Sequence, residues 1–177
     1  RGAKPSFLSD SATSSKIASA VAFRRASDAI KNGQPNAVAV VGEYFRIIET
    51  GLEEFRIALT DDNKNTFDET MVISVSDFLP YRNEIIEIFS SIAQYSCTTE
   101  MCHVVHRFFE SLIPYLSRPN DINSWNETDY DNFRFIVHEL FIYAVGVFIK
   151  FEKYDAASYL VSNEYFWDRP GGGDAAM

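Results

Sequence analysis

The feature that most constrains this chain is the stretch near residues 129–152, in which large apolar side chains recur every three or four residues. That spacing is the signature of a helix with a buried face, and it runs through Phe133, Ile136, Val137, Leu140, Phe141, Ala144, Val147, Phe148 and Phe151. A second apolar set covers much of the other side of the same helix: Phe135, Ile142, Tyr143, Val145 and Ile149. A helix that is apolar nearly all round is central in a fold or carries a second face at an interface. We therefore predict a central helix here and treat the second set as a candidate interface.

The remaining apolar pattern predicts further helices. The spacing places them at residues 15–31, 35–59, 80–95, 98–116 and 154–163. Residues 71–75 read Met-Val-Ile-Ser-Val and can form either a short strand or an extended linker. Because a lone strand has nothing to pair with, the predicted fold is all-α, a compact bundle of five to six helices.

The chain divides into one helical domain and two short ends. Its 177 residues match the size of a single domain, which we place at residues 15–167. Residues 1–14 are rich in Ser and Ala and show no period, which predicts a flexible lead-in. Residues 168–177 contain a proline followed by three glycines, which predicts a linker to another part of a longer protein.

The net charge restricts the classes of partner that we expect, and the cysteine content indicates the cellular compartment. A net charge of −9 argues against a general nucleic-acid binder and against docking on anionic membranes. The longest apolar run, Leu140–Ile149, is about half the length that crosses a membrane, so we interpret it as a core helix and expect no membrane contact. Cys97 and Cys102 are too few and too close for a disulfide framework, and no secretory signal is visible, which favours the cytoplasm.

One cluster contains residue types that bind metals. Cys102, His103 and His106 are weak candidates for metal ligands, with Glu110 one helical turn further on. Structural zinc sites draw on two separated ligand pairs, and the sequence offers no second pair of Cys or His. We therefore predict no metal and no cofactor, and we interpret the two histidines as part of a polar helix face.

A second constellation offers an enzymatic alternative. Arg134 and His138 are four residues apart, so they project from one side of the predicted helix, where His can move a proton and Arg can stabilise an oxyanion. The pair resembles the motif of the HEPN family, all-helical domains that include metal-independent ribonucleases. In that family four to six residues separate Arg from His, whereas three do so here. The resemblance implies a ribonuclease or RNA-sensing domain of a defence or toxin system, with Arg134 and His138 as its catalytic residues.

Other catalytic signatures are absent from the sequence. It contains no GxxxxGK[ST], no G-x-S-x-G and no H-E-x-x-H. Residues 151–160 resemble the mid-repeat turn of a tetratricopeptide-type hairpin, but no second copy appears at a period near 34 residues. The favoured function is therefore a non-catalytic interaction, assembly or regulatory domain of a larger intracellular protein. Its partner would be another protein or a second copy in a homodimer, and nucleic acid enters only under the ribonuclease alternative.

Overall fold

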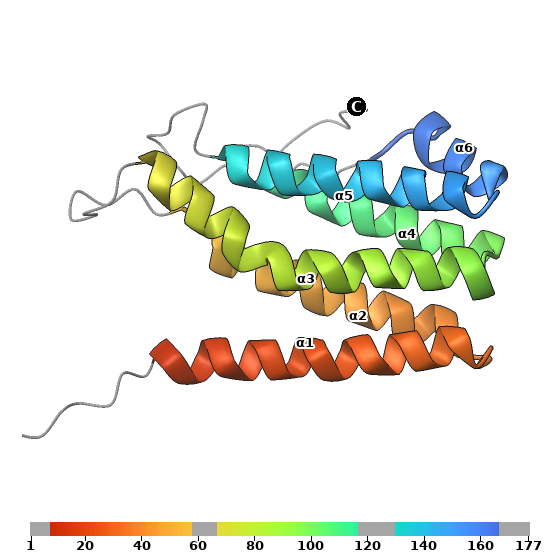
Figure 1. The fold of residues 1–177 in the computed structure, drawn as a ribbon, viewed down its shortest axis with the longest axis horizontal. Coiled ribbons are helices and arrows are strands. Elements are labelled where there is room, and N and C mark those ends of the chain that lie inside the picture. Colours follow the sequence, from red (N-terminus) through yellow and green to blue (C-terminus); the bar gives the residue numbers. More distant parts are fainter. Residues whose placement is uncertain (1–7, 58–66, 117–129, 167–177) are drawn as a thin grey trace, which may run out of the picture.

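A computed structural model describes residues 8–57, 67–116 and 130–166 of the chain. It confirms the all-α prediction, because the described part contains helices and no strand (Figure 1). The helices are α1 (Leu8–Lys31), α2 (Ala37–Gly51), α3 (Phe67–Tyr95), α4 (Thr99–Leu112), α5 (Asp131–Lys150) and α6 (Tyr154–Ser162). Two 3₁₀ turns extend the ends of α2 and α4, namely η1 (Leu52–Phe55) and η2 (Ile113–Leu116).

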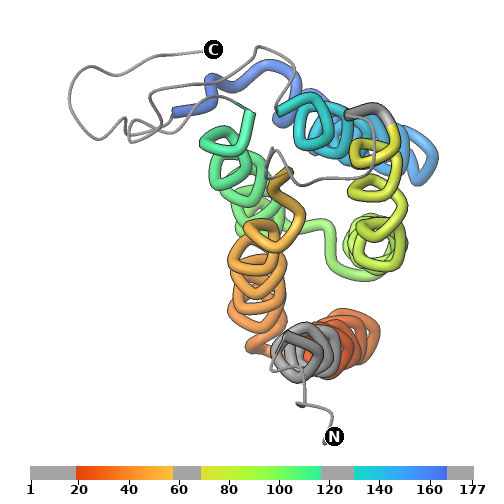
Figure 2. Tube along the Cα trace, turned by 90° about the vertical axis from the view of Figure 1, so that its left-hand side faces the viewer, coloured from red at the N-terminus to blue at the C-terminus, as the bar shows by residue number. Residues whose placement is uncertain are grey.

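The helices form a ring around one core. Viewed along the long axis, α1, α2, α4, α5 and α3 follow one another around it, and each packs on its neighbours (Figure 2). The short α6 packs on α5 and α4 at one end of the bundle. As a result α5 has neighbours on its inner side and both flanks, while its outer side faces away from the ring.

Three phenylalanine rings lie at the centre of the ring of helices. Phe45 of α2 stacks on Phe108 of α4, with ring centroids 4.2 Å apart. Phe89 of α3 lies 6.0 Å from the first of these rings and 6.5 Å from the second. The three rings therefore join three helices that are far apart in sequence, and each buried ring stabilises the fold by about 1.5–3 kcal/mol.

The structure corrects the prediction for residues 71–75, which lie within α3 and form neither a strand nor a linker. Pro80, expected at the first helical position, lies inside this helix. Proline has no N–H to donate, which weakens the helix at that point, and α3 bends within its first half (Figure 1). The buried side chains nevertheless keep a helical spacing across the bend: Ser74, Phe78, Tyr81, Ile85, Ile88 and Ile92. Core burial therefore outweighs the local cost of the proline.

Other helix boundaries agree with the predictions to different degrees. The first helix begins at Leu8 instead of residue 15, so it takes in part of the expected lead-in. The start of α4 is confirmed, because Thr98 caps it by accepting a hydrogen bond from the Met101 N–H at 3.2 Å. This helix ends at Leu112, short of the predicted end at residue 116, because Pro114 has no N–H to donate, and the chain continues as η2. The second predicted helix, residues 35–59, is shorter than expected, because α2 ends at Gly51, η1 ends at Phe55 and Arg56 is extended. The linker predicted at 168–177 lies outside the described residues.

Candidate functional site

The outer side of α5 carries large apolar side chains that the bundle leaves exposed. Ile142 is 70% exposed, Phe135 54%, Ile149 50% and Tyr143 41%. These are four of the five residues proposed for an interface. The fifth, Val145, is partly buried and packs against the core, because it lies toward the flank of the helix. Whether this side of α5 contacts another chain stays a prediction.

Five residues lie along the middle of this outer side, and we call them the α5 stripe: Phe135, His138, Ile142, Gly146 and Ile149. They follow one another at intervals of three or four residues, which places them on one helix face. All five are exposed, and none of them is an Asp, Glu, Lys or Arg. At 1.5 Å per residue the stripe is about 21 Å long.

One flank of the stripe is fixed to α3. The Arg82 guanidinium of α3 donates to the Glu139 carboxylate of α5 at 2.7 Å, and both side chains are partly buried. The same guanidinium lies 5.8 Å from the centre of the Tyr143 ring. Tyr143 is therefore held at the edge of the exposed surface by a cation–π contact, and it is not part of the stripe itself.

Within the described residues, α5 is also the one helix long and apolar enough to cross a membrane, judged by length and composition alone. Its mean hydropathy over the best window is 1.5, and 44% of that window is buried inside the bundle. The core helix of a soluble protein passes the same test. The apolar character of α5 therefore has two parts, a buried face and the exposed stripe.

The two residues of the ribonuclease alternative have different surroundings. Arg134 donates from Nε to the Leu116 carbonyl at 3.1 Å and from Nη1 to Asp131 Oδ1 at 2.9 Å. It thereby ties the first turn of α5 to η2. His138 is exposed and belongs to the α5 stripe. The catalytic reading of this pair stays a prediction, which RNA cleavage by the wild-type chain and its loss in His138→Ala would test.

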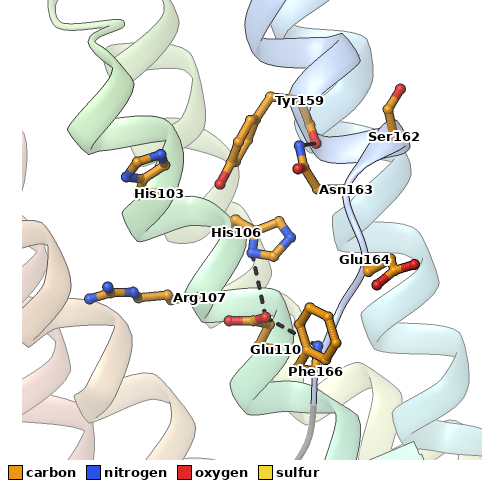
Figure 3. A pocket seen from close by; sticks show the side chains of 9 residues that line it. All are labelled: His103, His106, Arg107, Glu110, Tyr159, Ser162, Asn163, Glu164 and Phe166. Atoms are coloured by element: carbon orange, nitrogen blue, oxygen red, sulfur yellow. Dashed lines mark hydrogen bonds and ion pairs between the residues drawn. The ribbon is translucent and has the colours of Figure 1, made fainter. Parts of the chain in front are cut away.

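A pocket of about 650 Å³ lies between α4 and the end of α6 (Figure 3). His103, His106 and Glu110 of α4 line one side, and Tyr159 of α6 lines the other. Residues 163–166, which we call the C-terminal strap, run along its edge. Hydrogen bonds hold the strap at both ends: the Asn163 Nδ2 donates to the Tyr159 carbonyl at 2.7 Å, the Tyr165 hydroxyl to the Leu160 carbonyl at 2.6 Å, and the Phe166 N–H to Glu110 Oε1 at 3.1 Å.

His106 is the buried polar group of this pocket. Its ring stacks on Tyr165 of the strap at a centroid distance of 4.1 Å, and its Nδ1 lies 3.7 Å from Glu110 Oε1. Its Nε2 is buried with no hydrogen-bond partner in the described part of the chain. Burial lowers the pKa of His106, and the nearby His103 lowers it further. The Glu110 carboxylate and the backbone of Glu164 raise this pKa, but by less than the burial lowers it. The closed strap therefore favours the neutral imidazole.

The weak metal candidates do not converge. The described residues contain no group of three or more His, Cys, Asp or Glu that could hold a metal ion. The rings of His103 and His106 both lie against Tyr159, at 5.3 and 5.4 Å. Cys102 instead lines a separate pocket of about 440 Å³ together with Cys97, and burial raises the pKa of its thiol to about 12. A thiol with so high a pKa is a poor metal ligand and a poor nucleophile.

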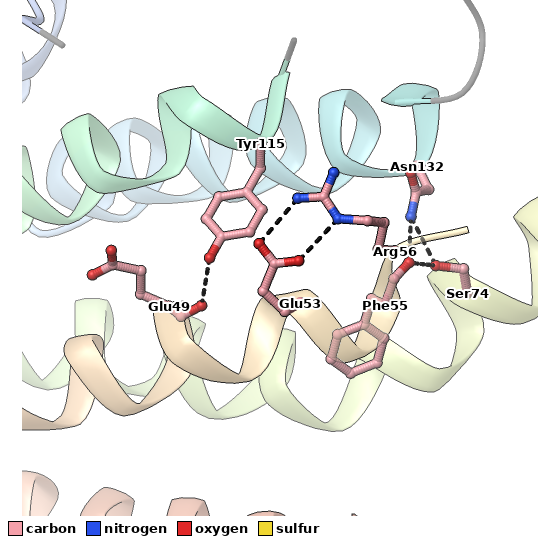
Figure 4. A network of polar contacts seen from close by, with 7 residues as sticks. All are labelled: Glu49, Glu53, Phe55, Arg56, Ser74, Tyr115 and Asn132. Atoms are coloured by element: carbon pink, nitrogen blue, oxygen red, sulfur yellow. Dashed lines mark hydrogen bonds and ion pairs between the residues drawn. The ribbon is translucent and has the colours of Figure 1, made fainter. Parts of the chain in front are cut away.

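A polar network fixes the start of α5 (Figure 4). Asn132, fully buried, donates from Nδ2 to the Phe55 carbonyl and to Ser74 Oγ, both at 2.9 Å. Ser74 donates to the same carbonyl at 3.0 Å. Near these bonds the Tyr115 hydroxyl donates to the Glu49 carbonyl at 3.0 Å. The network joins α5 to η1 and α3, so the outer side of α5 is presented by a fixed helix.

The sequence reasoning missed the buried roles of Asn132 and His106. A polar residue inside an apolar helical pattern is a signal for Asn132, because positions 132, 136, 140 and 144 share a face. For His106 the equivalent signal is its spacing from Cys102 and Phe109 on the buried side of α4. Comparison with protein-family models, curated proteins and solved structures finds no match for this chain.

Proposed function

We propose that this chain is a non-catalytic association domain that binds a second copy of itself through the α5 stripe. The observation that supports this proposal is the exposure of Phe135, Ile142 and Ile149 in one line on a rigid helix. Large contiguous apolar patches on soluble domains mark interaction sites, whereas scattered apolar residues do not. The low cysteine content favours a cytoplasmic setting for this association.

The exposed area matches the centre of a protein interface. Taking roughly 200 Å² for each large side chain, the exposed fractions of the stripe and Tyr143 leave on the order of 400 Å² of apolar surface. A stable interface buries about 800 Å² per partner, of which the apolar centre is only a part. Two copies meeting through this surface would therefore need a surrounding polar rim of similar size, which the flanks of α5 and the adjoining α3 can supply.

Charge also favours the stripe over other surfaces for self-association. Two copies that each carry a net charge of −9 repel one another at low ionic strength. An interface between them therefore has to avoid placing carboxylates against carboxylates. The α5 stripe meets this condition, because no charged residue lies on it.

Sedimentation velocity over a concentration series tests the proposal. The wild-type chain should shift from monomer to dimer as its concentration rises. Ile142→Glu should remain monomeric, because the new carboxylate would be buried without a partner at the centre of the contact. The matched control is Val161→Glu on α6, where the parent valine is 58% exposed and lies outside the stripe.

Three results would overturn the proposal. A wild-type chain that stays monomeric at high concentration would do so, as would dimers that persist in Ile142→Glu. The third is flotation of the chain with phosphatidylcholine vesicles in the absence of any self-association, because the stripe would then serve as a membrane-binding face. Thermal unfolding of both glutamate variants shows that each is folded, since both positions are exposed and neither change should lower the midpoint by more than a few degrees.

A further inference from the structure

The α5 stripe is symmetric about its central residue. Phe135 and Ile149 lie seven residues before and after Ile142, and His138 and Gly146 lie four residues before and after it. In an antiparallel helix pair about a two-fold axis, each residue meets the residue equally far on the other side of the axis, so the surface has to match itself when reversed. When two copies of α5 run antiparallel across Ile142, the stripe meets this requirement with a large side chain at its centre and at both ends.

The antiparallel arrangement also explains Gly146. Glycine is a poorer helix former than alanine. A Cβ at Gly146 would meet no atom within 4 Å, so packing within the chain does not require glycine here. In the antiparallel register, the partner's His138 lies at the same height, about 6 Å from the two-fold axis. The missing side chain leaves room for the imidazole ring and for close approach of the two helices.

Charges at the ends of α5 favour the same direction. Asp131 lies in the first turn of the helix and Lys150 in its last turn. An antiparallel pair brings the acidic start of one helix toward the basic end of the other and opposes the two helix dipoles, which is favourable. A parallel pair would instead bring Asp131 near Asp131 and Lys150 near Lys150, although the Arg134 ion pair at 2.9 Å partly neutralises the carboxylate.

We propose that two copies of the chain dock with their α5 helices antiparallel about a two-fold axis at Ile142, each His138 seated at the Gly146 of the other copy. This inference rests on the proposed function and specifies its geometry. Phe135 of one copy then contacts Ile149 of the other, about 10 Å from the axis on either side.

Cysteine crosslinking distinguishes the two directions. Ile142→Cys should form a 142–142 disulfide under air oxidation, because residues on the axis of a tight helix pair approach within disulfide range. Phe135→Cys alone should not crosslink, since two copies of this residue lie about 20 Å apart in the antiparallel register. An equimolar mixture of Phe135→Cys and Ile149→Cys should give the mixed 135–149 disulfide. Mass spectrometry identifies each linkage and separates it from reactions of the native Cys97, and Val161→Cys is the control for collision between exposed thiols.

A second variant tests the close approach without a crosslink. Gly146→Leu should weaken dimerisation by about fivefold or more, because the added side chain would overpack a tight contact. The same change should leave the thermal unfolding midpoint of the monomer unchanged or raise it, since glycine is the poorer helix former.

The possible failures of the two proposals differ. A 135–135 linkage, or undiminished dimerisation of Gly146→Leu, would overturn the antiparallel geometry while association through the stripe remained. The absence of a 142–142 linkage in a chain that sediments as a stripe-dependent dimer would have the same meaning. A chain that sediments as a monomer would overturn both the geometry and the proposed function.

Discussion

Replacing Asn132 by alanine tests whether the buried network at the start of α5 fixes this helix. The side chain is fully buried and donates two hydrogen bonds, to the Phe55 carbonyl and to Ser74 Oγ. The Phe55 carbonyl keeps one donor in the variant, because Ser74 also donates to it at 3.0 Å. The substitution therefore removes two bonds without leaving that carbonyl unpaired.

The expected loss in the free energy of unfolding is about 2 kcal/mol. Each lost hydrogen bond contributes about 1 kcal/mol, and the cavity left by the amide costs on the order of 1 kcal/mol more. Against this, Asn132 Oδ1 has no hydrogen-bond partner among the described residues, and its removal recovers about 1 kcal/mol. Asn132→Asp should cost more than alanine does, because a carboxylate would face the Phe55 carbonyl with no proton to donate.

Urea unfolding measures this loss, and Asn36→Ala is the matched control. Asn36 is exposed at the start of α2 and its side chain makes no capping hydrogen bond, so its replacement should cost less than about 0.5 kcal/mol. Ser74→Ala should cost about 1 kcal/mol and should be less than additive with Asn132→Ala, because the two residues share a bond. Equal stabilities of Asn132→Ala and the wild-type chain would refute the account of the network.

Three further predictions concern the strap and the core. Because burial lowers the pKa of His106, the unfolded chain binds more protons than the folded chain as the pH falls below about 6.5, so the free energy of unfolding should decrease there. His106→Phe should flatten that decrease in urea titrations between pH 7.5 and 5, and an unchanged slope would contradict the assignment. Tyr165→Phe removes the 2.6 Å bond to the Leu160 carbonyl and should cost about 1 kcal/mol, with faster hydrogen exchange in the strap but not in α2. Phe108→Ala should cost about 3–5 kcal/mol in thermal unfolding, and a loss below 1 kcal/mol would show that the stack with Phe45 is not the centre of the core.

The parts of the fold that follow from local chemistry could be predicted from the sequence. The apolar spacing of α5 and α6 predicts both helices closely, and Thr98 predicts the start of α4 because its hydroxyl can accept from a free N–H. The first half of α3 could not be predicted in the same way. Pro80 and the β-branched residues before it locally disfavour a helix, and only burial against other helices overrides that preference.

In the candidate sites, too, features that follow from local spacing could be predicted, whereas contacts between distant residues could not. The exposed residues of α5 were predicted because an apolar set lies opposite a buried set on one helix. The fixation of Tyr143 by Arg82, and the stacking of His106 on Tyr165, depend on pairs that are 61 and 59 residues apart in the chain. Sequence spacing carries no information about such contacts, because they form only when α3 meets α5 and the strap meets α4.

The measurement that tests the central claim most directly is a dilution series of the unmodified chain, followed through the methyl resonances of its isoleucines. If two copies associate through the α5 stripe, the Ile142 and Ile149 methyl signals should move with concentration along a single monomer–dimer isotherm. The signals of Ile85 and Ile88, which are fully buried in the core, should stay in place. Ile142 and Ile149 signals that do not move at any concentration, or movement confined to residues outside α5, would contradict the claim.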